Sequence, residues 1–178
     1  MQTKKKIYFM ILIFVLLAIS ILTIFGGRNI QARRALNRFS NLIGTENLDG
    51  VRLTIYYMNT FIFTNPISVD ELIRRSDVDS YTNKIIVYGD SLEEHRGLLK
   101  QLNSKAFTPV IKKSYLDTRL CYIFETDDDG EILVVAFGDL GNIIFVNGVE
   151  VKSNKIFIDI IKPFLTEDAI KKLAGYFN

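Results

Sequence analysis

The chain has 178 residues, with 22 Lys and Arg, 20 Asp and Glu, one histidine and one cysteine. A single cysteine excludes an intrachain disulfide, and a single histidine excludes HExxH and any metal site built on two histidines. Residues 1–38 contain seven Lys and Arg and no acid, whereas residues 39–178 contain fifteen Lys and Arg against twenty Asp and Glu. The acidic character of the longer part argues against nucleic acid as a partner.

An uncharged apolar run follows the basic N-terminal tail. Residues 1–6 end in Lys4, Lys5 and Lys6, and the run extends from Ile7 to Phe25. As a helix it would span about 28 Å, close to a hydrocarbon core of about 30 Å. It is longer than a signal-peptide h-region and its exit has no A-x-A cleavage pattern. We therefore predict an uncleaved transmembrane anchor; the alternatives are a cleaved signal peptide and a buried helix of a soluble protein.

The orientation of this anchor depends on the basic residues around it. Lys and Arg flank both of its ends in nearly equal number, so the positive-inside rule favours neither orientation clearly. A first hydrophobic segment behind a lysine cluster resembles an export signal, so we expect the N-terminus inside and the C-terminal domain outside the cytoplasm. The flanking basic residues are candidates for contacts with lipid headgroups of the bilayer: Lys4, Lys5, Lys6, Arg28, Arg33, Arg34 and Arg38.

Residues 26–49 are predicted to form a basic amphipathic juxtamembrane helix and a linker. Apolar residues recur at helical spacing from Ile30 to Ile43, and arginines occupy the other faces. This helix could lie on the membrane surface or continue the anchor as a stalk. It could equally pack its apolar stripe on the following domain. Both interpretations stay open at this point, and the linker is expected from Gly44 to Gly50.

Residues 50–178 have the pattern of a globular α+β domain. Capping boxes begin helices at Ser68 and Ser91, Pro163 interrupts a third helix, and Thr166 begins a fourth. Asn147-Gly148 predicts a type I′ hairpin. We predict a single domain with an antiparallel sheet or meander and three to four short helices, preceded by the transmembrane helix. The expected strands are residues 51–58, 61–63, 84–88, 119–125, 132–137, 143–146 and 149–151, and the expected helices 68–75, 91–103, 156–164 and 166–175.

No motif in this chain predicts a catalytic, cofactor or metal site. Asp127–Gly130 resembles part of a calcium loop, but Ala136 stands where the closing Glu is required, so a hairpin turn is favoured. His95 falls on an apolar helical stripe and is interpreted as half-buried. Cys121 lies in a Val-, Ile- and Phe-rich stretch and is predicted to be a buried thiol. Nucleophile-elbow, P-loop and dinucleotide-binding patterns are absent from the sequence.

Bulky residues cluster after Val51 and offer a candidate partner surface. If one face of the predicted first hairpin is open, Tyr56, Met58, Phe61 and Phe63 form an exposed surface for another protein. If the hairpin is central in the sheet, both of its faces belong to the core.

Several segments together resemble a known type of domain: Lys84–Ser91, Leu98–Leu102, Asp129-Gly130 and Phe145–Gly148. Over residues 50–165 the chain resembles small uncharacterised α+β domains of membrane-anchored and lipoprotein-type proteins of Gram-positive bacteria. The resemblance implies an extracytoplasmic setting and no known activity. Many such relatives have a lipobox cysteine, which this chain lacks, so its mode of anchoring differs.

The sequence favours a single-pass, membrane-anchored, extracytoplasmic domain that binds a partner protein, a peptide or an envelope ligand. Its partners would then be the lipid bilayer and such a ligand, without nucleic acid and without a cofactor. Two alternatives belong to other classes. One is a small membrane-bound enzyme with an unmarked carboxylate or tyrosine site; the other is an immunity or accessory factor that acts through its transmembrane helix.

Overall fold

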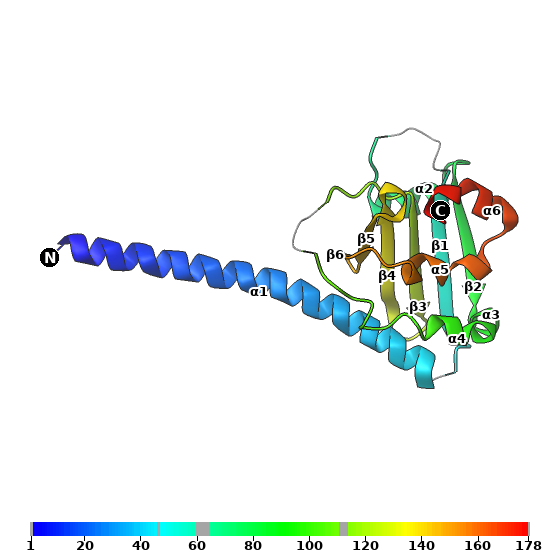
Figure 1. The fold of residues 1–178 in the computed structure, drawn as a ribbon, viewed down its shortest axis with the longest axis horizontal. Helices are drawn as coiled ribbons and strands as arrows, with labels where there is room; N and C mark the ends of the chain where they lie inside the picture. Colours follow the sequence, from blue (N-terminus) through cyan, green and yellow to red (C-terminus); the bar gives the residue numbers. More distant parts are fainter. Residues whose placement is uncertain (1, 46, 60–64, 111–113, 178) are drawn as a thin grey trace.

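A six-stranded antiparallel sheet forms the centre of the fold (Figure 1). The computed structural model describes residues 2–45, 47–59, 65–110 and 114–177, without the side chains of residues 2–9, 17–25 and 45. The strand order is β2-β1-β3-β4-β5-β6. The strands are β1 (Val51–Met58), β2 (Thr82–Tyr88), β3 (Leu120–Thr126), β4 (Gly130–Gly138), β5 (Ile143–Val146) and β6 (Val149–Val151). The α+β class and the antiparallel sheet are thus confirmed.

Two hairpin turns adopt the backbone that their sequences predict. Asn147 and Gly148 have φ values of 46° and 73°, as both central residues of a type I′ turn require. Gly130, which ends the turn between β3 and β4, has a φ of 66°. The Asp127–Gly130 segment is therefore a hairpin turn. Because β3–β4 and β5–β6 are successive antiparallel hairpins, both turns lie toward the same end of the sheet.

Short helices cover the two faces of the sheet. Ser68 and Thr166 cap α2 and α6, since their side-chain oxygens accept from the backbone N–H of Glu71 and Ala169. The described residues after α1 contain five short α-helices rather than three or four: α2 (Val69–Ser76), α3 (Gly89–Glu94), α4 (Arg96–Leu99), α5 (Ile156–Asp159) and α6 (Glu167–Lys172). Short 3₁₀ turns add η1 (Asp139–Gly141), η2 (Lys162–Phe164) and η3 (Ala174–Tyr176).

The predicted helix 91–103 is wrong in its bounds, for a tertiary reason. α3 begins two residues before Ser91, and non-helical His95 separates it from α4. A Cβ on Gly89 would lie 2.0 Å from the carbonyl oxygen of Leu48, so the chain approaches itself there as only glycine allows. Arg96, which begins α4, donates to the carbonyl of Ile43 at 2.7 Å and so supplies a partner at the C-terminal end of α1.

The long N-terminal helix α1 (Gln2–Thr45) joins the N-terminal segment to the core (Figure 1). Its first part extends away from the sheet, and its last part packs against it. The predicted span of residues 7–25 lies within α1, and only the side chains of residues 10–16 of it are in the described set. Among the residues that were described, no helix is both long and apolar enough to cross a membrane.

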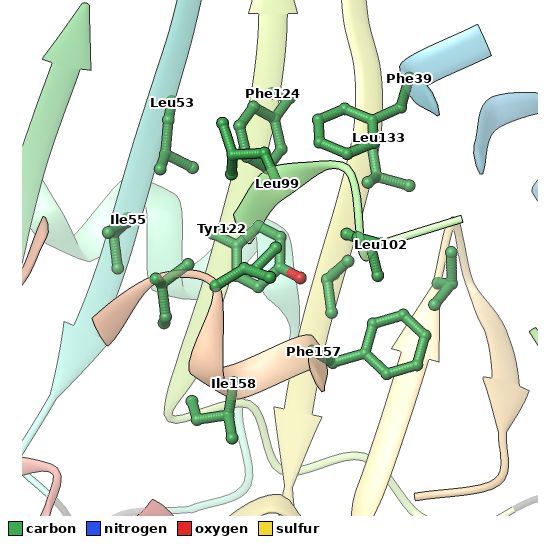
Figure 2. Close-up of a cluster of buried hydrophobic side chains, with 14 of the residues drawn as sticks. Phe39, Leu53, Ile55, Leu99, Leu102, Tyr122, Phe124, Leu133, Phe157 and Ile158 are labelled. Atoms are coloured by element: carbon green, nitrogen blue, oxygen red, sulfur yellow. The ribbon is translucent and has the colours of Figure 1, made fainter. Parts of the chain in front are cut away.

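The main core lies between one face of the sheet and a layer made of α1 and the C-terminal helices. Leu36 and Phe39 of α1 are fully buried, and the ring centroids of Phe39 and Phe124 are 4.5 Å apart (Figure 2). The apolar stripe of residues 30–43 packs on the domain, as one interpretation has it, and the same helix is continuous with the apolar run of residues 7–25. The buried positions of the stripe are Ala32, Leu36, Phe39, Leu42 and Ile43.

Replacing Phe39 by alanine tests this packing. We expect Phe39→Ala to lower the free energy of unfolding by about 3–5 kcal/mol, because a buried aromatic ring is lost and a cavity remains. Urea denaturation of the full chain in a fixed detergent measures the change. Asn37→Ala, on an exposed face of the same helix, is the control and should change it by less than about 0.5 kcal/mol. Equal effects of the two variants would contradict the burial.

Candidate functional site

The contact between α1 and the sheet end is the first candidate region. Arg28 donates from Nη2 to the carbonyl of Gly148 in the β5–β6 turn at 3.3 Å. Arg38 pairs with Asp129 in the β3–β4 turn. The guanidinium of Arg33 lies over the Phe107 ring, 5.4 Å from its centroid. Three arginines predicted as headgroup contacts therefore have partners within the protein.

These contacts leave much of the arginine surface in solvent. Half of the Arg38 side chain remains exposed, as does Arg34, which lines a cleft of about 420 Å³ with Asn37, Asn41 and Asp129. The side chains of Lys4, Lys5 and Lys6 lie outside the described set. Contact of the basic residues with lipid therefore stays a prediction.

The predicted partner surface is divided by the structure. Tyr56 and Met58 are buried, with exposed fractions of 7% and 1%, because α2 covers this face of β1. Those two side chains are therefore not an exposed surface, which corrects that part of the prediction. Tyr57, on the other face of β1, is buried in the main core, so both faces of the strand are core at this end. Phe61 and Phe63 lie outside the described residues.

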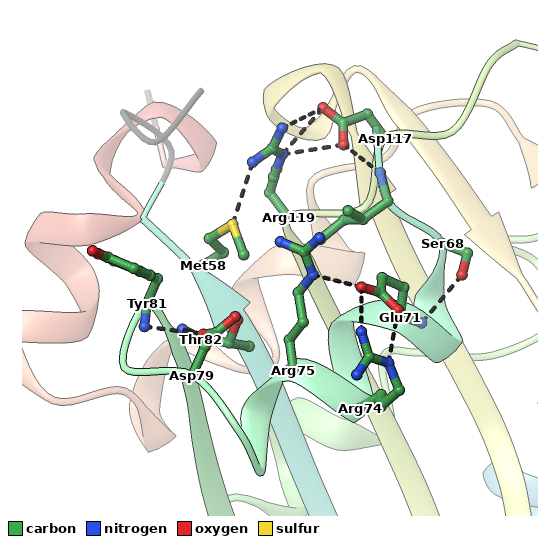
Figure 3. A network of polar contacts seen from close by, with 11 residues as sticks. Met58, Ser68, Glu71, Arg74, Arg75, Asp79, Tyr81, Thr82, Asp117 and Arg119 are labelled. Atoms are coloured by element: carbon green, nitrogen blue, oxygen red, sulfur yellow. Dashed lines mark hydrogen bonds and ion pairs between the residues drawn. The ribbon is translucent and has the colours of Figure 1, made fainter. Parts of the chain in front are cut away.

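A polar cluster joins the two ends of the segment between β1 and α2 (Figure 3). Both oxygens of Asp117 accept from the Arg119 guanidinium, at 3.0 and 3.1 Å, and Oδ1 also accepts from the backbone N–H of Ile67. Arg119 Nη1 lies 3.3 Å from the sulfur of Met58. Met58 and Ile67 flank residues 59–66, so the Asp117–Arg119 pair fixes the base of that segment.

Next to this pair, Glu71 on α2 neutralises two arginines. Its carboxylate accepts from Arg74 at 2.8 and 2.9 Å and from Arg75 at 2.7 Å (Figure 3). These hydrogen bonds lower the pKa of Glu71 to about 2. The contribution of this carboxylate is thus present above its unfolded pKa and lost as the pH falls toward 2. The arrangement stabilises a short helix and leaves no carboxylate oxygen poised for proton transfer near neutral pH.

Two other residues singled out in the sequence, His95 and Cys121, have definite structural positions. His95 is half-buried, and its ring meets that of Phe164 edge-on at 5.1 Å. Cys121 is buried in the sheet, and burial raises the pKa of its thiol. Among the side chains that the structure describes, no group of three His, Cys, Asp or Glu is placed to hold a metal ion.

Two buried tyrosines, Tyr122 and Tyr176, are poor candidates for acid–base chemistry. Tyr122 is fully buried in the main core, and burial raises its pKa well above the ordinary value (Figure 2). Burial also raises the pKa of Tyr176, which lines a small cleft of about 170 Å³ beside Ser153 and Asn154. Neither hydroxyl would be ionised near neutral pH. Three surface clefts, beside Arg34, Asn29 and Ser153, contain among their lining residues a single carboxylate, that of Asp129.

The two edges of the sheet differ in a way that the sequence did not signal. The outer edge of β6 is covered by residues 108–110. The backbone N–H of Val110 donates to the carbonyl of Glu150, and that of Lys152 donates to the carbonyl of Thr108. Pro109 and Val151 form an isolated antiparallel β-bridge. On the outer edge of β2, no strand pairs within the described parts of the chain. Beside that edge Ile86 and Tyr88 are 41% and 62% exposed on one face. The open β2 edge is therefore a second candidate region.

Removing the Asp117 carboxylate tests the polar cluster. We expect Asp117→Ala to lower the free energy of unfolding by about 1–3 kcal/mol, because Arg119 and the N–H of Ile67 lose a half-buried acceptor. The amide of Ile67 should also exchange its hydrogen faster, measured by exchange with mass spectrometry. Lys155→Ala removes an exposed ion pair with Asp159 and should cost no more than about 0.5 kcal/mol. Unchanged exchange at Ile67 would contradict the role given to Asp117.

Comparisons with known proteins do not add a family to this geometry. A scan of protein-family models, a search of curated proteins and a search of solved structures found no significant match.

Proposed function

We propose that this protein is a single-pass, membrane-anchored α+β domain that is held outside the cytoplasm and binds a partner protein. The observation that carries the proposal is the continuity of α1: one helix contains the apolar run of residues 7–25 and, further on, the buried stripe from Ala32 to Ile43. Burial of that stripe gives the helix a firm connection to the sheet. A run of this length behind three lysines favours a signal anchor.

The proposed binding surface is the open β2 edge, and its occupant is an extended segment of a partner protein. An unpaired strand presents backbone N–H and C=O groups that an added strand can satisfy. Exposed Ile86 and Tyr88 would contact alternate side chains of that segment. The chain already closes its other edge in this manner, with its own residues 108–110 on β6. That internal example supports the choice of an extended peptide.

Charges placed in the apolar run test the anchor. The full chain should stay with the membrane fraction after an alkaline carbonate wash, whereas a Leu12→Arg, Leu16→Arg variant should be released. An arginine near the centre of a spanning helix costs about 2.5–3.5 kcal/mol, so two should prevent insertion. Immunoblotting of a tag placed after Asn178 measures both. Protease added to intact spheroplasts should remove that tag, and protection until lysis would contradict the external location.

Site-specific photo-crosslinking tests the β2 edge. A photoreactive residue in place of Tyr88 should give a discrete adduct in native membranes, and Ile86→Asp should weaken it about tenfold or more, because a charge would face an apolar partner. The matched control is the same photoreactive residue at Tyr115, which is also exposed and follows Ser114, a residue bound to Glu150 at the opposite edge of the sheet. An adduct that persists with Ile86→Asp, or that forms equally at Tyr115, would contradict binding at this edge.

A further inference from the structure

We propose that one side of the domain rests on the headgroups of an anionic bilayer. This side, called the β6 side, consists of the β5–β6 turn, β6, residues 107–110 and the part of α1 from Arg28 to Arg34. The inference rests on the membrane anchor of the proposed function and adds to it a lipid-binding surface on the folded domain. It concerns the edge of the sheet opposite to the proposed partner site.

The position of the β6 side follows from the length of helix between the apolar run and the first domain contact. Arg28 comes three residues after Phe25, which is about 4.5 Å along a helix. A headgroup layer is about 5–7 Å thick on each side of the hydrocarbon core. Arg28 donates to the carbonyl of Gly148. The β5–β6 turn would therefore lie at the level of the headgroups.

The orientation of the domain follows from the same contacts. The fully buried side chains of Ala32 and Leu36 prevent α1 from turning about its axis relative to the sheet. Arg28 on Gly148, before that stripe, and Arg33 on Phe107, within it, add further contacts. Figure 1 shows α1 leaving the domain past β6, the strand nearest to its projecting part. The edge that faces the bilayer is thus β6 and not β2.

The chemistry of the β6 side suits anionic lipid. Arg34 and Lys152 are exposed on it. Glu150 of β6 has its carboxylate bound by Ser114, whose backbone N–H and hydroxyl donate at 2.6 and 2.9 Å. Exposed apolar groups stand among these charges, with Ile30 at 52% and Val110 at 37% exposure. Basic residues with apolar neighbours are the pattern of a surface that binds phosphate headgroups and enters the interface.

Lysine acylation of the unaltered full chain gives the first test. The chain is reconstituted in phosphatidylcholine vesicles with and without phosphatidylglycerol, treated with an acylating reagent and analysed by mass spectrometry. Relative to detergent micelles, acylation of Lys152 should fall several-fold in the anionic vesicles and less in the neutral ones, because anionic headgroups attract this side. Acylation of Lys171, exposed on α6, should not change. The same change in acylation at Lys152 and at Lys171, relative to micelles, would overturn the proposal.

A distance measurement gives the second test. In a Cys121→Ala background, nitroxide labels are attached through Thr108→Cys on the β6 side and Ser91→Cys on α3, both exposed positions. Nickel bound to a chelating headgroup should remove signal amplitude at position 108 and leave position 91 unchanged. Arg34→Glu should reduce the loss at 108. The same loss at both labels would overturn the proposal.

Flotation of the vesicles distinguishes failure of the membrane anchor from failure of lipid binding by the β6 side. A chain that does not float contradicts the membrane anchor and the β6 side with it. A chain that floats while acylation changes equally at Lys152 and Lys171 contradicts only lipid binding by the β6 side. The proposal of a membrane anchor then stands.

Discussion

The burial of one face of α1 against the sheet is the interaction on which the rest of the structure depends. Leu36 and Phe39 belong to the main core, and α1 packs against β3 and β4 through them. The same packing brings Arg28 and Arg38 to the two hairpin turns. A helix that the sequence presents as an attachment is therefore a structural part of the domain.

Local patterns predicted the sheet well because strand period and turn chemistry are local properties. Asn147-Gly148 specifies its turn without help from the rest of the chain. The break at His95 and the early start of α3 depend on the contact of Gly89 with Leu48, forty-one positions away, which no local pattern contains. Burial of Tyr56 and Met58 likewise depends on α2 crossing that face, so their size alone could not distinguish core from surface.

The sequence predicted how much positive charge the N-terminal part has, but not which groups its arginines contact. Composition placed the basic excess before residue 39, where it suits lipid headgroups. The structure divides these arginines between protein contacts, as at Arg38 and Asp129, and solvent-exposed positions such as Arg34. The open β2 edge was also beyond prediction, since whether a strand is central or at an edge depends on strand order.

Because α1 is one helix from the apolar run to the core, the rotational phase between them is set by residue count. Each residue of an α-helix turns the chain by about 100° and advances it by about 1.5 Å. One residue gained or lost between Phe25 and Ala32 would redirect the domain by more than a quarter turn while leaving every core contact in place. The number of residues in this short stretch is thus under a constraint that its side chains do not reveal: it sets which face of the apolar run points in the same direction as the sheet.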